Sequence, residues 1–358
     1  MDLSRSPNTL QYFYQVVYDL NNSLYGPVIK NQLQTLGLSF LDYKFFITGG
    51  AATSFYLKDQ VPIQDIDCTL VINPKIPITQ QRQFYRILNT DLISSLTFWI
   101  NAAASFWPSI LVELRANGFQ LEDTLPQENI QFRRQGYGMN NFSPDVNLEL
   151  LIDILESMNL HVNAGCPFRI TYHSSVTFDE TNLEMVLISV KPRVKGNPAS
   201  IPSLLDISFY KPLHKTNEYD YDLSLDPYPK PLYQGPGRFG MLPVANPLYI
   251  YLNQKSSALT NTRPDKIASR THRANLLEAY LISTYYDDSI LSKYLEKTIQ
   301  LFSRWFYEHS NLLHENDYRY YDIENLFRNL LDALQGKLQE GGRKKSKKQR
   351  KSRRKLRS

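Results

Sequence analysis

Two aspartates at alternate positions of one apolar run are the residues with the clearest chemical potential. Asp65 and Asp67 belong to the segment QDIDCTLVI, whose β-branched and apolar residues predict a strand over 65–72. Side chains at i and i+2 of a strand share a face, so the two carboxylates should point the same way. Their repulsion must be relieved by protonation, a basic partner or a divalent cation. Oxygen ligands suit Mg²⁺ or Mn²⁺; solvated acids at a strand end are the ordinary alternative.

A pair of glycines precedes these acids. Gly49 and Gly50 follow a short apolar run and are followed by a stretch of helical composition, 51–58. Glycines at a strand-to-helix junction let backbone N–H groups approach a ligand, and the helix start favours an anion. Thr53 and Ser54 fall in the first turn, where a hydroxyl either binds a phosphate oxygen or caps the helix. A phosphate loop followed by a cation-binding strand end predicts a nucleoside triphosphate with Mg²⁺.

A third carboxylate on a neighbouring strand is ordinarily needed for a two-metal phosphoryl-transfer site. Asp206 lies inside the apolar run LLDISFY, where a charge is costly unless it faces a functional edge of the sheet. Asp153 in LLIDILE has the character of a polar helix face, and Asp179 and Glu180 lie in a turn. We therefore predict that Asp206 joins Asp65 and Asp67.

These motifs need a sheet to hold them. Besides strands over 44–48 and 65–72, the pattern predicts strands over 168–172, 183–191 and 204–210, with short turn-rich connections that favour antiparallel pairing. The prediction is an α/β (α+β) fold with a mixed sheet of about five strands. Helices are expected at 8–36 (two, interrupted at Gly26-Pro27), 79–117, 146–159, 264–284, 288–308 and 321–339.

Composition shifts divide the chain. With 358 residues it is long enough for two domains with sizeable cores. We expect N-terminal helices over 1–40, a palm-like catalytic domain over 41–211, a linker rich in Pro, Gly and Tyr over 212–247, a helical C-terminal domain over 248–340, and a disordered basic tail over 341–358.

Other features limit the classes of protein. The N-terminus lacks the pattern of a secretory signal, and two cysteines make neither a disulfide framework nor a zinc cluster, which favours a reducing, intracellular compartment. The apolar stretch 92–114 contains Asn101 and Pro108, so we expect a buried helix with a break near Pro108 and no membrane span.

Charge is concentrated in the tail. Residues 343–357 carry 11 Lys/Arg and no acid, which leaves 29 basic against 35 acidic residues in 1–342, a net charge of −6. Such a block predicts either an RNA anchor, through residues such as Lys344, Lys345, Arg350 and Arg353, or a localisation, solubility or packaging tail.

The motifs together resemble a known signature. Gly49-Gly50, a Ser/Thr-bearing helix and Asp65-Ile66-Asp67 resemble the signature of the DNA polymerase β-like nucleotidyltransferase superfamily. Within it, GGAATSFYL, QDIDCTLVI, LLDISFY and the lysine-rich tail are similar to the poly(A) polymerase catalytic subunits of large cytoplasmic DNA viruses. The resemblance implies a nucleotidyltransferase fold and template-independent addition of AMP from ATP to RNA 3′ ends.

The resemblance also implies roles for residues. Asp65 and Asp67 would bind two Mg²⁺ or Mn²⁺ ions, and Asp206 would complete the one that activates the attacking hydroxyl. The triphosphate would be held by Gly49, Gly50 and Ser54, with a basic residue from the helical domain. Lys266 and Arg270 lie four residues apart on one face of a predicted helix and are the candidates for this contact. The ordinary alternative is that they form a solvated basic face.

Partners and location follow from the same resemblance. They are a single-stranded RNA 3′ end, ATP, and a second copy of the chain or a processivity/cap-methyltransferase subunit, without a membrane, in the host cytoplasm (viral factory) and the virion. Two other hypotheses stay open: a non-catalytic RNA-binding or virion protein that keeps the fold, and a nucleotidyltransferase that acts on a non-RNA acceptor.

Overall fold

The computed structural model describes residues 2–73, 75–121, 128–129, 131–135, 161–162, 165–176, 184–195, 201–210, 230–231, 241–260 and 263–287. The chain forms two compact units, Met1–Asn246 and Pro247–Ser358. The helices expected at 146–159, 288–308 and 321–339, together with Asp153, Asp179, Glu180, most of the linker and the basic tail, lie outside the described residues.

A mixed sheet is the centre of the first unit. Neighbouring strands pair antiparallel except for β2 with β8 and β6 with β4, which run parallel. The predicted α+β class with a mixed sheet is therefore confirmed. The order across the sheet is β1 (Tyr43–Thr48), β2 (Ile66–Ile72), β8 (Leu205–Tyr210), β7 (Glu184–Pro192), β6 (Phe168–Val176) and β4 (Gln131–Gln135).

The sheet has one strand that the sequence did not predict. β4 has the sequence QFRRQ, which lacks the apolar alternation that marks a half-buried strand. It lies at the edge of the sheet, where polar strands are common because one side of the ladder stays unpaired. Two short pairs complete the described strands: β3 (Glu128–Asn129) with β5 (His161–Val162), and β9 (Lys230–Pro231) with β10 (Met241–Leu242).

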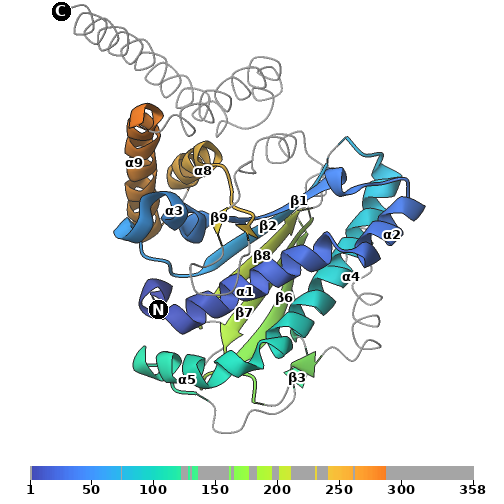
Figure 1. Ribbon diagram of the computed structural model, residues 1–358, viewed down its shortest axis with the longest axis horizontal. Helices are drawn as coiled ribbons and strands as arrows, with labels where there is room; N and C mark the ends of the chain where they lie inside the picture. Colours follow the sequence, from blue (N-terminus) through green and yellow to red (C-terminus); the bar gives the residue numbers. More distant parts are fainter. Residues whose placement is uncertain are drawn as a thin grey trace, which may run out of the picture. The chain divides into compact units, whose positions relative to one another are not determined.

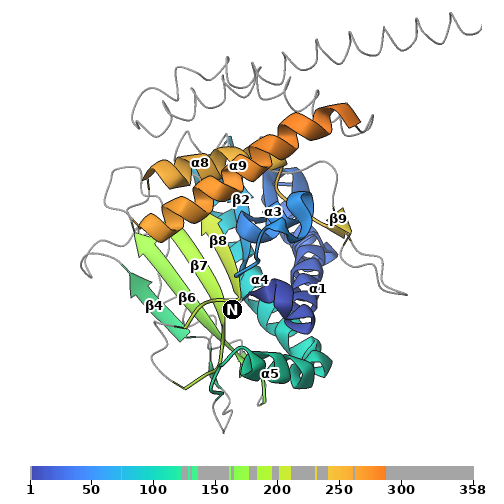
Figure 2. The ribbon, with the colours of Figure 1, turned by 90° about the vertical axis from the view of Figure 1, so that its left-hand side faces the viewer.

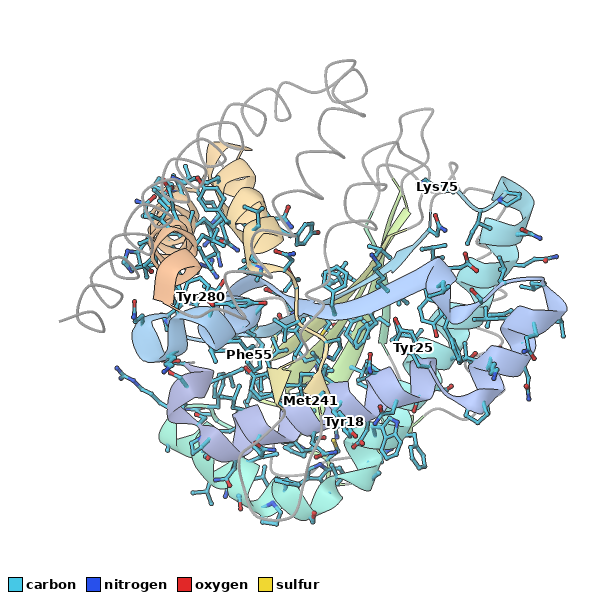
Figure 3. All side chains as sticks on the ribbon, turned by 45° about the horizontal axis from the view of Figure 1, so that its top comes forward. Tyr18, Tyr25, Phe55, Lys75, Met241 and Tyr280 are labelled. Carbon is cyan, nitrogen blue, oxygen red and sulfur yellow. The ribbon has the colours of Figure 1, made fainter. Side chains whose placement is uncertain are left out.

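The N-terminal helices end and begin where the sequence indicated. α1 (Pro7–Leu24) and α2 (Pro27–Thr35) are separated at Tyr25-Gly26, and Pro27 opens α2, where its missing N–H costs no hydrogen bond. Tyr25, labelled in Figure 3, stacks on Tyr43 of β1 with ring centroids 4.9 Å apart. The turn between the two helices is thereby fixed against the sheet.

The long helical region breaks near Pro108. α4 (Ile78–Ala102) ends at Ala102, and α5 (Trp107–Ala116) carries Pro108 in its first turn. The expected break near Pro108 is confirmed: it falls directly before α5, because a proline in the first turn starts a helix without losing a bond. Among the described residues no single helix is long and apolar enough to span a membrane; the bent pair Asp91–Ala102 and Ala104–Ala116, at 48°, meets that test only when taken together.

Helices α1 and α4 pack on one face of the sheet (Figures 1 and 2). Tyr12 of α1 stacks on Phe168 of β6 at 5.2 Å, and its hydroxyl donates to the Ile100 carbonyl of α4 at 2.9 Å. The strand residues that face these helices are apolar and buried: Ile66, Cys68 and Leu70 of β2, Leu205 and Ile207 of β8, Ile188 and Val190 of β7, and Phe168 and Ile170 of β6. The polar residues of the same strands must therefore lie on the opposite face.

The second unit is described through two helices. α8 (Pro247–Thr260) and α9 (Pro264–Asp287) pack together through Tyr251, whose hydroxyl donates to Glu278 at 3.0 Å, and through Lys255, which donates to Asn275 at 3.0 Å. The expected helix over 264–284 is thus present.

Candidate metal and nucleotide site

Three carboxylates converge on the polar face of the sheet. Asp67 of β2 and Asp206 of β8 are register partners on adjacent parallel strands, and Asp65 immediately precedes β2. One carboxylate oxygen from each of the three lies within 4.8 Å of the others, and all three residues are half-buried. The predicted convergence of Asp65, Asp67 and Asp206 is confirmed as geometry.

Strand register explains why distant segments meet here. Thr48 of β1 pairs with Asp67, Asp67 with Asp206, Asp206 with Ser189 of β7, and Ser189 with Thr171 of β6. Register partners share a face, so this row of five polar residues crosses five strands on the side away from α1 and α4. Asp65 and Asp67 then meet Asp206 because β2 and β8 are neighbours, although they are far apart in the sequence.

The carboxylate of Asp206 is held from one side. Ser203 Oγ donates to Asp206 Oδ2 at 2.7 Å. The other oxygen, Oδ1, is buried and has no hydrogen-bond partner among the described residues. A buried carboxylate oxygen without a donor is costly unless a cation or another ligand satisfies it.

The missing side chain of Gly49 makes room for Asp67. Gly49 has φ +64°, a conformation that L-residues rarely adopt. A Cβ at this position would overlap Asp67 Oδ2 and lie 3.0 Å from Asp67 Cγ. Glycine is therefore required at position 49 for two reasons: the left-handed backbone conformation and the space taken by the Asp67 carboxylate. The sequence alone does not distinguish these reasons from a role in phosphate binding.

A helix begins directly beside the carboxylates. α3 (Gly49–Leu57) follows Thr48, the register partner of Asp67, and its first N–H groups have no acceptor within the helix. In the part of the chain that the structure describes, Thr48 makes no side-chain capping bond to this helix start. The phosphate-binding loop predicted from Gly49 and Gly50 is thus next to the three acids.

The two hydroxyls predicted to meet a phosphate, those of Thr53 and Ser54, form hydrogen bonds within α3 itself. Thr53 is fully buried and donates to the Gly49 carbonyl at 2.8 Å, while the half-buried Ser54 donates to the Ala51 carbonyl at 2.6 Å. Of the two residues expected to touch a phosphate, Thr53 lies in the core and Ser54 nearer the surface. Phe55, labelled in Figure 3, packs on Tyr14 of α1 with ring centroids 5.5 Å apart.

Neither cysteine offers a reactive thiolate. Cys68 and Cys166 are free and buried. Burial, aided by the charges of Asp67 and Asp206, raises the pKa of Cys68 well above its ordinary value, and burial raises the pKa of Cys166 to about 12. Both thiols stay protonated at neutral pH, so the ligands available at this site are oxygens, as Mg²⁺ and Mn²⁺ prefer.

The other expected site residues lie elsewhere. Lys266 and Arg270 are half-buried in α9 of the second unit, so their expected contact with a triphosphate stays a prediction. Tyr251, on the neighbouring helix α8, is 2% exposed and belongs to the α8–α9 core. Lys344, Lys345, Arg350 and Arg353 lie outside the described residues.

Comparison with known proteins adds little to this geometry. No protein-family model and no curated protein matches the sequence. One similar solved structure is that of an antigenic nucleotidyltransferase-like protein from Paracoccidioides brasiliensis, at 10% sequence identity, covering 82% of this chain and 91% of that chain with a TM-score of 0.26. A TM-score this low establishes neither fold nor function.

Proposed function

We propose that this chain is a metal-dependent nucleotidyltransferase. The observation that carries the proposal is the register that places the start of α3, beside Thr48, next to the carboxylates of Asp67 and Asp206. A helix start and a cluster of three acids are each common alone. Their juxtaposition matches what a nucleoside triphosphate with a divalent cation requires: donors for phosphate oxygens and anionic ligands for the metal.

The donor set fits a hard divalent cation. Three carboxylates within 4.8 Å repel one another, and Asp206 Oδ1 has no hydrogen-bond partner among the described residues. A bound Mg²⁺ or Mn²⁺ would offset that repulsion, lower the pKa of an attacking hydroxyl and stabilise charge on a leaving pyrophosphate. Asp65 and Asp67 would hold the cation or cations on β2, with Asp206 as the third ligand from β8.

The chain's own groups would orient the nucleotide. The N–H groups at the start of α3 and the positive end of the helix dipole would bind the triphosphate, with Gly50 allowing close approach. Ser54 is nearer the surface than Thr53 and is the better hydroxyl candidate. Asp206, next to β7, would lie on the side from which an acceptor hydroxyl approaches.

At a finer level we propose transfer of AMP from ATP to RNA 3′ ends. This step is supported by the resemblance of GGAATSFYL, QDIDCTLVI and LLDISFY to viral poly(A) polymerase catalytic subunits. The 11 basic residues of 343–357 provide a sequence-independent attraction for RNA, whereas the body of the chain has a net charge of −6. Lys266 and Arg270 are the basic residues we propose for the triphosphate.

Incubation of the full chain with an oligonucleotide RNA, Mg²⁺ or Mn²⁺ and each NTP separately tests the proposal. A ladder with ATP alone supports polyadenylation; extension with another NTP keeps the nucleotidyltransferase and corrects its substrate. Asp67→Asn should slow extension by about 10³-fold, because several kcal/mol of charge stabilisation are lost. Asp19→Asn, on α1 at the opposite face of the sheet, is the matched control and should match the wild-type rate.

Two outcomes would reject the proposal. Wild-type protein that binds RNA but extends it with no NTP would favour a non-catalytic RNA-binding protein. Full activity of Asp67→Asn would show that the transfer occurs at another place in the chain.

A further inference from the structure

One hydrogen bond to the carboxylate cluster comes from a residue with no predicted role. Ser203 Oγ donates to Asp206 Oδ2 at 2.7 Å, three residues away in the sequence. Both side chains are half-buried. The bond engages one oxygen of the carboxylate and leaves Oδ1 buried without a hydrogen-bond partner among the described residues.

The backbone around Ser203 is fixed on both sides. The next residue, Leu204, is fully buried; its N–H donates to the Val190 carbonyl of β7, and its carbonyl accepts from the Ile66 N–H of β2, each at 2.9 Å. The preceding residue is Pro202, whose ring restricts φ. The hydroxyl of Ser203 is therefore presented to Asp206 from a segment with little freedom to move.

A hydroxyl in this place fixes the rotation of the carboxyl group, because its hydrogen bond holds Oδ2 at Ser203 and so sets where Oδ1 lies. Mutation of a residue that orients a metal-binding group in this way typically lowers the metal affinity by about 10–100-fold.

We propose that Ser203 is a positioning residue, which holds the Asp206 carboxylate so that Oδ1 completes a divalent-cation site with Asp65 and Asp67. The inference rests on the metal-dependent nucleotidyltransferase proposed above, and it assigns a function to the segment before β8. Ser203 touches neither the cation nor a substrate; it acts through Asp206.

The alternative is that the bond only closes a local turn, as serine and aspartate commonly do. The chain offers a matched control for this: Ser39 Oγ donates to Asp42 Oδ2 at 3.1 Å, also over three residues, at a capping box before β1. Both bonds join a serine to an aspartate at the same spacing, but Asp42 is not one of the three clustered acids.

The test is titration of the full chain with Mn²⁺, followed by the electron paramagnetic resonance signal of free Mn²⁺, with Tm measured beside it. Ser203→Ala should bind Mn²⁺ about 10–100-fold more weakly than wild type. Ser203→Thr, which keeps the hydroxyl, should remain within about threefold, and Ser203→Cys, of similar size but a weak donor, should resemble Ser203→Ala. Ser39→Ala should lower Tm, because it removes a capping box, and should leave the Mn²⁺ affinity unchanged.

The outcomes separate this inference from the function on which it rests. Wild-type affinity in Ser203→Ala, or equal losses in Ser203→Ala and Ser39→Ala, would overturn the positioning role. If the wild-type chain binds no Mn²⁺, the metal site and the positioning role fall together. If Mn²⁺ binding falls in Ser203→Ala while the wild type transfers no nucleotide, the positioning role stands and the proposed reaction fails.

Discussion

Replacement of Gly49 by alanine tests the arrangement at the start of α3. An alanine there must adopt φ near +64°, and its Cβ would overlap Asp67 Oδ2 and lie 3.0 Å from Asp67 Cγ. The two penalties act on different properties. The backbone conformation lowers stability, whereas the overlap displaces the carboxylate that we propose as a metal ligand.

The magnitudes can be separated with a second glycine. Gly37 has φ +69°, and a Cβ added to it would meet nothing within 4 Å. Gly37→Ala should therefore lower stability only through the backbone conformation, by about 1–2 kcal/mol for an L-residue in the left-handed region. Gly49→Ala should lose the same stability, and Asp67 must also rotate or α3 must shift. A displacement of about 1 Å in a reacting group lowers the reaction rate about 10²-fold.

The assay combines thermal unfolding with Mn²⁺ titration by calorimetry. Both variants should lose a few degrees in Tm, since about 1 kcal/mol corresponds to about 2–4 °C at this size. Gly49→Ala alone should lose about 10²-fold in Mn²⁺ affinity and in nucleotide transfer. Equal Mn²⁺ affinity in the two variants would refute the reasoning that Gly49 is kept for the carboxylate of Asp67.

Three further predictions concern stability and RNA affinity. Burial raises the pKa of Asp91 from 3.8 to about 6, so folding favours its neutral form, and the chain loses stability as the pH rises from about 4 through 6. Asp91→Asn should stabilise the chain at pH 8 by at most about 3 kcal/mol, and by about 1 kcal/mol once screening of the partly exposed carboxyl is included, with no difference below pH 4 in denaturant unfolding. Glu113 accepts from the N–H groups and side chains of Asn8 and Thr9 at the start of α1; burial alone would raise its pKa, but these bonds lower it below 4.5. Glu113→Gln should cost about 1 kcal/mol at pH 7, and the cost should shrink as the pH falls below 4.5; a constant cost would contradict the charged cap. Removal of 343–358 should weaken RNA binding and flatten its salt dependence in filter-binding assays, and an unchanged slope would remove the tail from the RNA-binding account.

The spacing of apolar residues in the sequence was sufficient to predict most of the helices and strands. The apolar runs of β1, β2, β6, β7 and β8 were each identified, because their inner faces are continuous rows of buried apolar residues. β4 was missed because an edge strand needs no such row. The break near Pro108 was indicated by the proline itself, which lies in the first turn of α5, where it costs no hydrogen bond.

The sequence predicted the three aspartates of the site, but it did not predict the residues around them equally well. Asp206 was identified as a charge inside an apolar run, a local signal, but its pairing with Asp67 depends on β2 and β8 being neighbours, which no local signal encodes. Thr53 was expected to contact a phosphate, but its side chain is buried in the core. Neighbouring residues of a helix point in different directions, so the sequence did not show which of Thr53 and Ser54 would be nearer the surface. Ser203 carried no signal at all, because a lone serine in a Pro-Ser turn is ordinary until its distance to Asp206 is known.

Anomalous scattering at the manganese absorption edge tests the central claim most directly. Crystals of the full chain soaked with MnCl₂ and a non-hydrolysable ATP analogue should show a peak bound by oxygens of Asp65, Asp67 and Asp206, with metal–oxygen distances of about 2.0–2.3 Å. The analogue's phosphates should lie at the start of α3, beside Gly50. Crystals that show the analogue bound and no manganese among the three carboxylates would contradict the account.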